Sequence, residues 1–275
     1  MSEVRGILGV IGCPIMEDEI VYAVKRDEDI SKVYVIDNED SRNLVRKLRS
    51  ASMEPTVVSE EEAAAISSDG FSVLILMESV ALHENPSELR VKVASSVKRY
   101  MSKCRSILLF YGLCGNAFKD MSQVRDGASP PLFILTDTEG RTVDDCIAAV
   151  LGGTDGYLRL LRRYPGVFYL TPAWAENWKD MIYKMEVTRG SSRDDLSTLK
   201  WLFDLAGYRK ALKLDTGLGD QEVFDRKVDE FVKEFNFEKG ELEKEFICLD
   251  VIDSSYDRAK GEMAPDKRNG EDLRA

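Results

Sequence analysis

Short apolar runs alternate along this chain with longer segments that have helical periodicity. Two of the runs, at residues 6–13 and 106–116, end in turn-forming residues and are typical of buried strands. Similar strand-like runs occur at 33–36, 56–58, 72–77, 132–135, 167–170, 210–214 and 245–251. Helical patterns lie between them, at 17–25, 40–50, 59 onward, 86–103, 142–152, 175–187 and 194–207. A further amphipathic helical pattern follows the turn at 215–220 and ends at 235. This rhythm predicts an α/β fold with a doubly wound, mostly parallel, Rossmann-like sheet flanked by helices.

The domain organisation follows from where this pattern stops. Residues 1–253 are predicted to form one large α/β domain, in which a division into two lobes near Gly190 is an option. Residues 254–275 are charged, rich in small residues and without apolar periodicity. We therefore expect a disordered, charged tail at 254–275.

Charge and hydropathy exclude two classes of partner. The net charge is −11, and no basic stripe is visible that could neutralise phosphates, so we expect no nucleic-acid partner. No apolar run approaches the length of a membrane span, and the N-terminus lacks the pattern of a signal peptide. We expect a cytoplasmic protein whose widely spaced cysteines are reduced, catalytic or metal-bound rather than paired in disulfides.

Three of the five cysteines, Cys13, Cys114 and Cys146, lie where apolar runs give way to polar, helix-opening turns. The carboxyl ends of parallel strands meet at one edge of the sheet, and ligands bind at that edge. We therefore expect these three side chains to line one site. Cys146 also falls in the first turn of a predicted helix, where the helix dipole favours the thiolate.

Thiolates are preferred zinc ligands, and a catalytic zinc site combines three protein ligands with an open fourth position. The three cysteines therefore predict a site for about one zinc or similar divalent metal ion. No pair has Cys-x-x-Cys spacing, and the alternative is that these cysteines are small buried hydrophobic residues. We adopt this alternative for Cys104 and Cys248.

Two acidic residues lie close in sequence to these cysteines. Glu19, on the helix after the first strand, is the candidate catalytic residue, because its carboxylate could act as a base, as a fourth metal ligand or as a group that orients a ligand. An exposed helix carboxylate is the alternative. Asp145 stands three residues after Thr142, a spacing that fits a helix capping box.

Four residues at predicted strand ends are candidates for ligand binding: Asn116, Tyr169, Thr171 and Trp174. The Asn116 amide could orient a ligand, although Gly-Asn is also common in turns. The two aromatic residues could wall a pocket, although aromatic residues near strand ends are more often part of a core.

Several familiar motifs are missing. The sequence has no Walker A motif, and the glycine-containing turn at 215–219 lacks the third glycine of a dinucleotide-binding loop. A serine hydrolase would need His83, the single histidine, as its base, and no nucleophile elbow is present. We interpret His83 as a solvated loop residue.

Short motifs in a fixed order carry a resemblance to a known family. They are Cys13 with Glu19, the segment 111–116, Asp145-Cys146-Ile147 with Leu151-Gly152, Pro165-Gly166 with 169–172, and Trp174. Over residues 7–251 the chain resembles a domain family of unknown function from anaerobic archaea and bacteria, which often occurs beside corrinoid-dependent methyltransferase systems. That family commonly has His-Asp-Cys where this chain has Asp144-Asp145-Cys146, so no imidazole role is expected there.

The resemblance implies a function related to methyl transfer. The leading hypothesis is a thiolate-metal protein that acts as an enzyme or accessory factor in one-carbon or corrinoid-linked methyl metabolism, with a corrinoid protein or methyltransferase as partner. The alternative is a non-catalytic module that holds a small-molecule ligand or a corrinoid protein in the same cleft. Metal content and thiol-dependent methyl transfer would separate the two.

Overall fold

The larger part of the protein is built on a parallel sheet. The computed structural model describes residues 4–80, 82, 85–100, 102–124, 130–184 and 195–264. Within them, six strands pair in the order β3-β2-β4-β1-β5-β6, and every pair is parallel. The strands are β1 (Gly6–Gly12), β2 (Ile30–Ile36), β3 (Thr56–Val58), β4 (Phe71–Met77), β5 (Ser106–Phe110) and β6 (Leu132–Ile134). The predicted Rossmann-like α/β fold is thereby confirmed.

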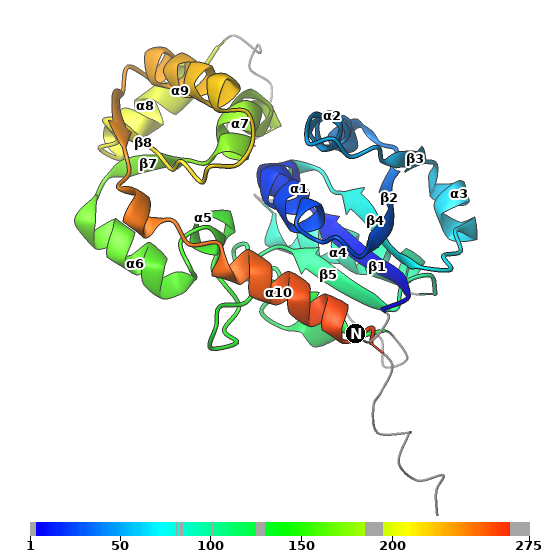
Figure 1. The fold of residues 1–275 in the computed structure, drawn as a ribbon. Coiled ribbons are helices and arrows are strands. Elements are labelled where there is room, and N and C mark those ends of the chain that lie inside the picture. The colour runs from blue at the N-terminus through cyan, green and yellow to red at the C-terminus, as the bar shows by residue number, and fades with distance from the viewer. Residues whose placement is uncertain are drawn as a thin grey trace, which may run out of the picture.

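Helices cover both faces of this sheet because its strands are apolar on both sides (Figure 1). From β1, Leu8 and Val10 pack against α1 (Glu17–Lys25), α2 (Arg42–Ser50) and α10 (Asp250–Gly261). The alternate residues Ile7 and Ile11 face the opposite side. That side is covered by α3 (Glu60–Ala65) and α4 (Pro86–Tyr100).

A second, smaller parallel sheet follows in the chain and lies beside the first (Figure 1). It consists of β7 (Val167–Leu170), β8 (Lys210–Lys213) and β9 (Glu238–Glu241). Its accompanying helices are α6 (Thr154–Arg163), α7 (Pro172–Lys184), α8 (Ser197–Leu205) and α9 (Gln221–Phe235). The chain passes from the first sheet to the second between β6 and β7, well before position 190, which itself lies outside the described residues.

The core of the smaller sheet is aromatic. Phe231 of α9 lies at its centre, fully buried, with its ring within 6 Å of five neighbouring rings. Those rings belong to Phe168, Trp174, Trp178, Phe235 and Phe237. Ile15 and Val80, in the segments that follow β1 and β4, join the same cluster, so the core of the small sheet continues to the edge of the large one.

The C-terminal part differs from the prediction. Residues 245–251 do not form a strand: a 3-10 turn at Lys244–Phe246 leads into α10. The predicted tail from 254 is helical as far as Gly261, because apolar side chains recur at helical spacing and bury Tyr256, Ala259 and Met263 against the sheet. Residues 265–275 lie outside the described part of the chain.

The middle of the chain also differs from the prediction. The helix expected over 142–152 is only the short α5 (Cys146–Ala149), because Thr142 instead forms a β-bridge with Thr136. The helix α6 was not predicted. In the described ranges, no helix has the length and apolarity that a membrane crossing requires.

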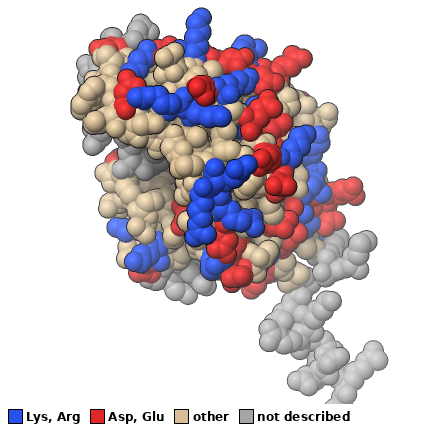
Figure 2. Space-filling view, turned by 90° about the vertical axis from the view of Figure 1, so that its left-hand side faces the viewer, with Lys and Arg blue, Asp and Glu red and all other residues tan. Residues whose placement is uncertain are grey.

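Surface charge is mixed. Figure 2 shows basic and acidic side chains interspersed over one face of the molecule rather than gathered by sign. The net charge of the protein is −11, and this face has no concentrated basic surface.

Candidate functional site

The site begins where two neighbouring strands of the large sheet end. Gly12 of β1 pairs with Phe110 of β5, so Cys13 and Tyr111 follow at the same edge. The chain leaves β1 toward β2 on one side of the sheet and leaves β5 toward β6 on the other. Neighbouring strands whose connections diverge in this way open a crevice, which is where open α/β sheets bind ligands.

A close approach of two backbone segments brings the third cysteine to this crevice. The Leu113 amide donates to the Val143 carbonyl at 2.7 Å, and the Cys114 amide donates to the Asp144 carbonyl at 3.0 Å. A Cβ atom at Gly112 would lie 2.5 Å from the Val143 carbonyl oxygen, so only glycine allows this approach. Cys146, at the start of α5, is thereby held next to Cys114.

The turn that carries Cys114 has an unusual backbone. Cys114 has a φ of 45°, and Asn116 has a φ of 69°, in the left-handed region. Asn adopts this conformation readily, but for Cys it costs free energy that the surrounding structure must offset. The turn therefore holds the Cys114 thiol in a position that an unconstrained chain would disfavour.

All three predicted cysteines line one cavity of about 300 Å³. The cavity lies at the carboxyl edge of the large sheet and is closed on one side by α7 from the small sheet, through Trp174 and Met181. Its other walls include Ile15, Met16, Val80, Leu89, Phe110, Tyr111, Asp145 and Ile147. The cavity is thus an apolar chamber with three thiols.

The three thiols of the cavity have raised pKa values and are protonated at neutral pH. Burial raises the pKa of Cys13 and of Cys114 to about 12. Burial, followed by the neighbouring charge of Asp145, raises the pKa of Cys146 well above its ordinary value. The sequence predicted a thiolate stabilised by the helix dipole at Cys146, whereas burial and the Asp145 charge raise its pKa and outweigh the dipole of the four-residue α5.

Glu19 is buried near two of these thiols and is not the exposed helix carboxylate considered as an alternative. Its side chain is 1% exposed, and neither carboxylate oxygen has a hydrogen-bond partner in another described residue. Burial raises the pKa of Glu19 to about 8. The carboxylate lies close enough to Cys13 and Cys146 to raise the pKa of both thiols.

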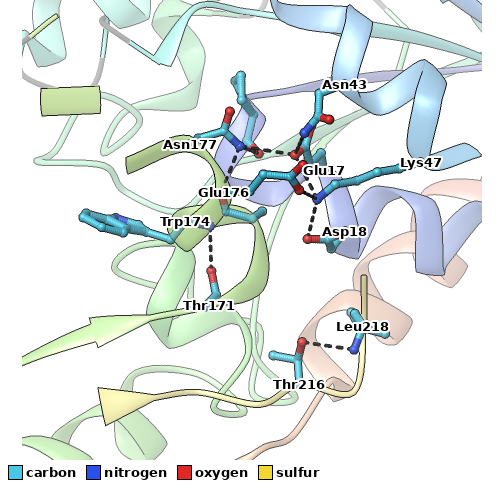
Figure 3. A network of polar contacts seen from close by, with 12 residues as sticks. Glu17, Asp18, Asn43, Lys47, Thr171, Trp174, Glu176, Asn177, Thr216 and Leu218 are labelled. Carbon is cyan, nitrogen blue, oxygen red and sulfur yellow. Dashed lines mark hydrogen bonds and ion pairs between the residues drawn. The ribbon is translucent and has the colours of Figure 1, made fainter. Parts of the chain in front are cut away.

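A buried ion-pair network adjoins Glu19 and was not predicted from the sequence. Lys47 of α2 is 8% exposed, and its Nζ lies 2.9 Å from Glu17 Oε1, 2.7 Å from Asp18 Oδ2 and 2.9 Å from Glu176 Oε2 (Figure 3). Asn177 of α7 donates to Glu17 Oε1 at 3.2 Å. The network joins α1 and α2 of the large sheet to α7 of the small one. The sequence signal that could have indicated this network is the amphipathic spacing of polar residues on the three helices that carry it.

The four predicted ligand-binding residues are not all at the cavity. Trp174 lines it. Thr171 is buried, and its hydroxyl accepts a hydrogen bond from the Trp174 amide at the start of α7 (Figure 3). Tyr169 donates to the Tyr164 carbonyl at 2.9 Å and lines a separate cavity of about 240 Å³. Asn116 is an exposed turn residue.

The remaining candidates have structural roles or lie elsewhere. Asp145 accepts hydrogen bonds from the amides of Ile147 and Ala148, so it caps α5 by itself and forms no capping box with Thr142. Cys104 and Cys248 do not line the thiol cavity. His83 lies outside the described residues.

The metal-binding candidates do not stand at metal-binding spacing. In the described part of the chain, no three Cys, His, Asp or Glu side chains stand close enough together to hold a metal ion as they are oriented. The donor types nevertheless suit a soft divalent ion, because three sulfur atoms share one cavity and the buried Glu19 carboxylate, which accepts no hydrogen bond from another described residue, lies near two of them.

Comparison with known proteins gives a family but no described relative. No curated protein and no solved structure matches this chain. A model of a protein family of unknown function, DUF1638, matches residues 77–247 of the chain. This region contains Cys114, Cys146 and Trp174 of the thiol cavity and the helix α7 that closes it. The chain belongs to the DUF1638 family of proteins of unknown function.

Proposed function

We propose that this protein is a thiolate-metal protein in which Cys13, Cys114 and Cys146 bind a zinc or similar soft divalent ion. The observation that carries the proposal is that these cysteines, from three separate turns, line one cavity at the ligand-binding edge of the sheet. Three thiolates are a sufficient protein ligand set for a zinc ion with an open fourth position.

The chain's own residues supply the conditions for such an ion. Without a metal ion the thiols are neutral, and no electrostatic attraction brings the three sulfur atoms close to one another. Binding of the ion requires the thiols to lose their protons and to change rotamer so that the sulfur atoms point toward it. The buried carboxyl of Glu19, with a pKa raised by burial to about 8, can hold or release a proton beside them near neutral pH. Apolar side chains make up most of the cavity wall.

We extend the proposal to methyl transfer. A zinc ion held by Cys13, Cys114 and Cys146 would lower the pKa of an incoming thiol, whose proton would pass to solvent. The thiolate sulfur would then form a bond to the methyl carbon while the bond between methyl and its donor breaks, and the donor would leave with that bond's electron pair. Because the family that this chain resembles often occurs beside corrinoid-dependent methyltransferase systems, a corrinoid protein or a methyltransferase is the partner that we propose. The methyl donor would reach the cavity between α7 and the edge of the large sheet.

Metal content tests the proposal directly. Reduced protein, purified and equilibrated with zinc, should retain about one ion per chain. Replacing Cys13, Cys114 or Cys146 with serine should each lower the retained zinc to a small fraction, measured by mass spectrometry of the metal after gel filtration. Cys104→Ser and Cys248→Ser are the matched controls, since both cysteines lie away from the cavity, and both variants should retain the ion. Equal zinc content in all five variants, or none in the wild type, would rule out the metal site.

A second candidate function is a metal-free binding module that holds a small molecule in the same cavity. Two observations favour it: most of the cavity wall is apolar, and the acidic and thiol side chains do not stand at metal-binding spacing. It predicts no retained zinc and no thiol-dependent methyl transfer. The metal measurement therefore separates the two candidates.

A further inference from the structure

A second cavity adjoins the thiol cavity and is lined mainly by aromatic rings. Its volume is about 240 Å³, and five of its nine lining residues are aromatic. They are Tyr157 of α6, Phe168 and Tyr169 of β7, Trp174 of α7, and Tyr208, which precedes β8. We call this space the aromatic cavity. Because Trp174 and Ile147 also line the thiol cavity, the two cavities are direct neighbours.

The rings of the aromatic cavity meet at steep angles instead of stacking. The Tyr157 and Tyr169 rings are inclined by 77°, with centroids 6.3 Å apart. Phe168 is inclined by 66° to Trp174 and by 66° to Tyr208, with centroids 4.8 Å and 5.9 Å apart. Apart from Trp174, which is buried, the five rings are half-buried. Since no parallel neighbour covers them in these pairs, part of their electron-rich faces remains available to a ligand.

The charges around the aromatic cavity favour a cation. Its described lining contains no Lys, Arg or His, and no described Lys or Arg lies over any of the five rings. Elsewhere the fold does place a cation over a ring, as with Lys213 over Phe224. A negative charge is within reach, because the Asp145 carboxylate adds to the effect of burial in raising the pKa of Tyr157 above its ordinary value.

Aromatic ring faces attract cations, and several rings around one space recognise a quaternary ammonium group, which has no proton to donate. The aromatic cavity is smaller than a pocket for a drug-sized molecule, roughly 300–1,000 Å³, so it suits one small group. We infer that the aromatic cavity binds a quaternary ammonium group of a small molecule and holds it next to the thiol cavity. The inference goes beyond the proposed function, because it requires neither a metal ion nor methyl transfer.

Two ligands of the same shape test the preference for a cation. Choline carries a trimethylammonium group, and its carbon analogue carries an uncharged tert-butyl group in the same place. Each would be titrated into the reduced, metal-free protein at constant ionic strength, with dissociation constants measured by NMR. Choline is expected to bind about tenfold more tightly, because attraction to several rings adds to apolar contact. Equal affinities, or no binding of choline, would overturn the inference. This comparison uses the unaltered protein, so it does not depend on whether any variant folds.

Variants of Tyr157 and Tyr208 test whether choline binds in this cavity. Tyr157→Leu and Tyr208→Leu each remove a ring and should weaken choline binding about 3–10-fold, whereas Tyr157→Phe and Tyr208→Phe keep the ring and should bind within about twofold of the wild type. Tyr22→Leu is the matched control, because Tyr22 is also half-buried but lies outside the cavity. Unchanged choline binding in both leucine variants would overturn the assignment to this cavity. Zinc retention is measured separately, so failure of the metal proposal is distinguishable from failure of this one.

Discussion

Replacing Glu19 with glutamine is expected to stabilise the metal-free protein by about 3–5 kcal/mol at pH 9 and by much less at pH 5. Burial raises the pKa of Glu19 to about 8 in the folded protein, above the ordinary value of a glutamate. The fold therefore disfavours the ionised carboxylate. The penalty is absent below the ordinary pKa, grows as the pH rises, and is complete above pH 8. Glutamine carries no charge at any of these pH values.

Urea denaturation of the wild type and Glu19→Gln at pH 5 and pH 9 measures this effect. Glu61→Gln is the matched control, because Glu61 is an exposed residue of α3, and its free energy of unfolding should change by less than about 0.5 kcal/mol at either pH. A destabilised Glu19→Gln variant at pH 9 would show that the carboxylate is satisfied in the fold. The same variant should keep its α/β fold, since the amide occupies the same volume.

The Lys47→Met variant is expected to lose about 3–5 kcal/mol of stability at pH 8. Methionine fills similar space but leaves the Glu17, Asp18 and Glu176 carboxylates without their shared cation. Removing one partner of a buried ion pair is strongly destabilising because the remaining charge stays buried. Even with Lys47 present, burial raises the pKa of Glu17 to about 7, so without the lysine its ionisation becomes still less favourable.

The pH dependence of this loss has a definite sign. At pH 5 Glu17 is protonated, so it no longer needs a cation, and the loss in the Lys47→Met variant should be smaller than at pH 8. Thermal or urea unfolding at the two pH values measures the difference. Lys98→Met, at an exposed position of α4, should change stability by less than about 0.5 kcal/mol. A loss that grows as the pH falls would contradict the role assigned to Glu17.

Local sequence signals were sufficient to indicate the sheet and the thiol site. Strands such as β1 and β5 are short, continuously apolar and closed by turn residues, so their type and ends follow from composition alone. The parallel arrangement then requires Cys13 and the Cys114 turn to lie at one edge. Cys146 was correctly assigned to a helix start, although the length of that helix was not.

The remaining features depend on contacts between residues far apart in the chain. The acidic residues 17–19 look like a solvated first turn of a helix, and only the docking of Lys47 and of Glu176 shows that they are buried. Likewise the pKa of Cys146 is set by burial rather than by the helix start that the sequence shows. For α10, a charged composition suggested disorder, but a narrow apolar stripe proved sufficient to dock the helix on the sheet.

The helix α7 belongs to the small sheet yet contributes to two features of the large one. Trp174 and Met181 close the thiol cavity, while Glu176 and Asn177 bind the Lys47 network. A molecule in the cavity therefore touches both halves of the protein at once and acts as a bridge between them. Separation of the small sheet with its helices from the large sheet must release a molecule bound in the cavity and break the Lys47 ion pair with Glu176 at the same time. Occupancy should consequently raise the melting temperature of the whole chain in a single transition, rather than protect one half alone.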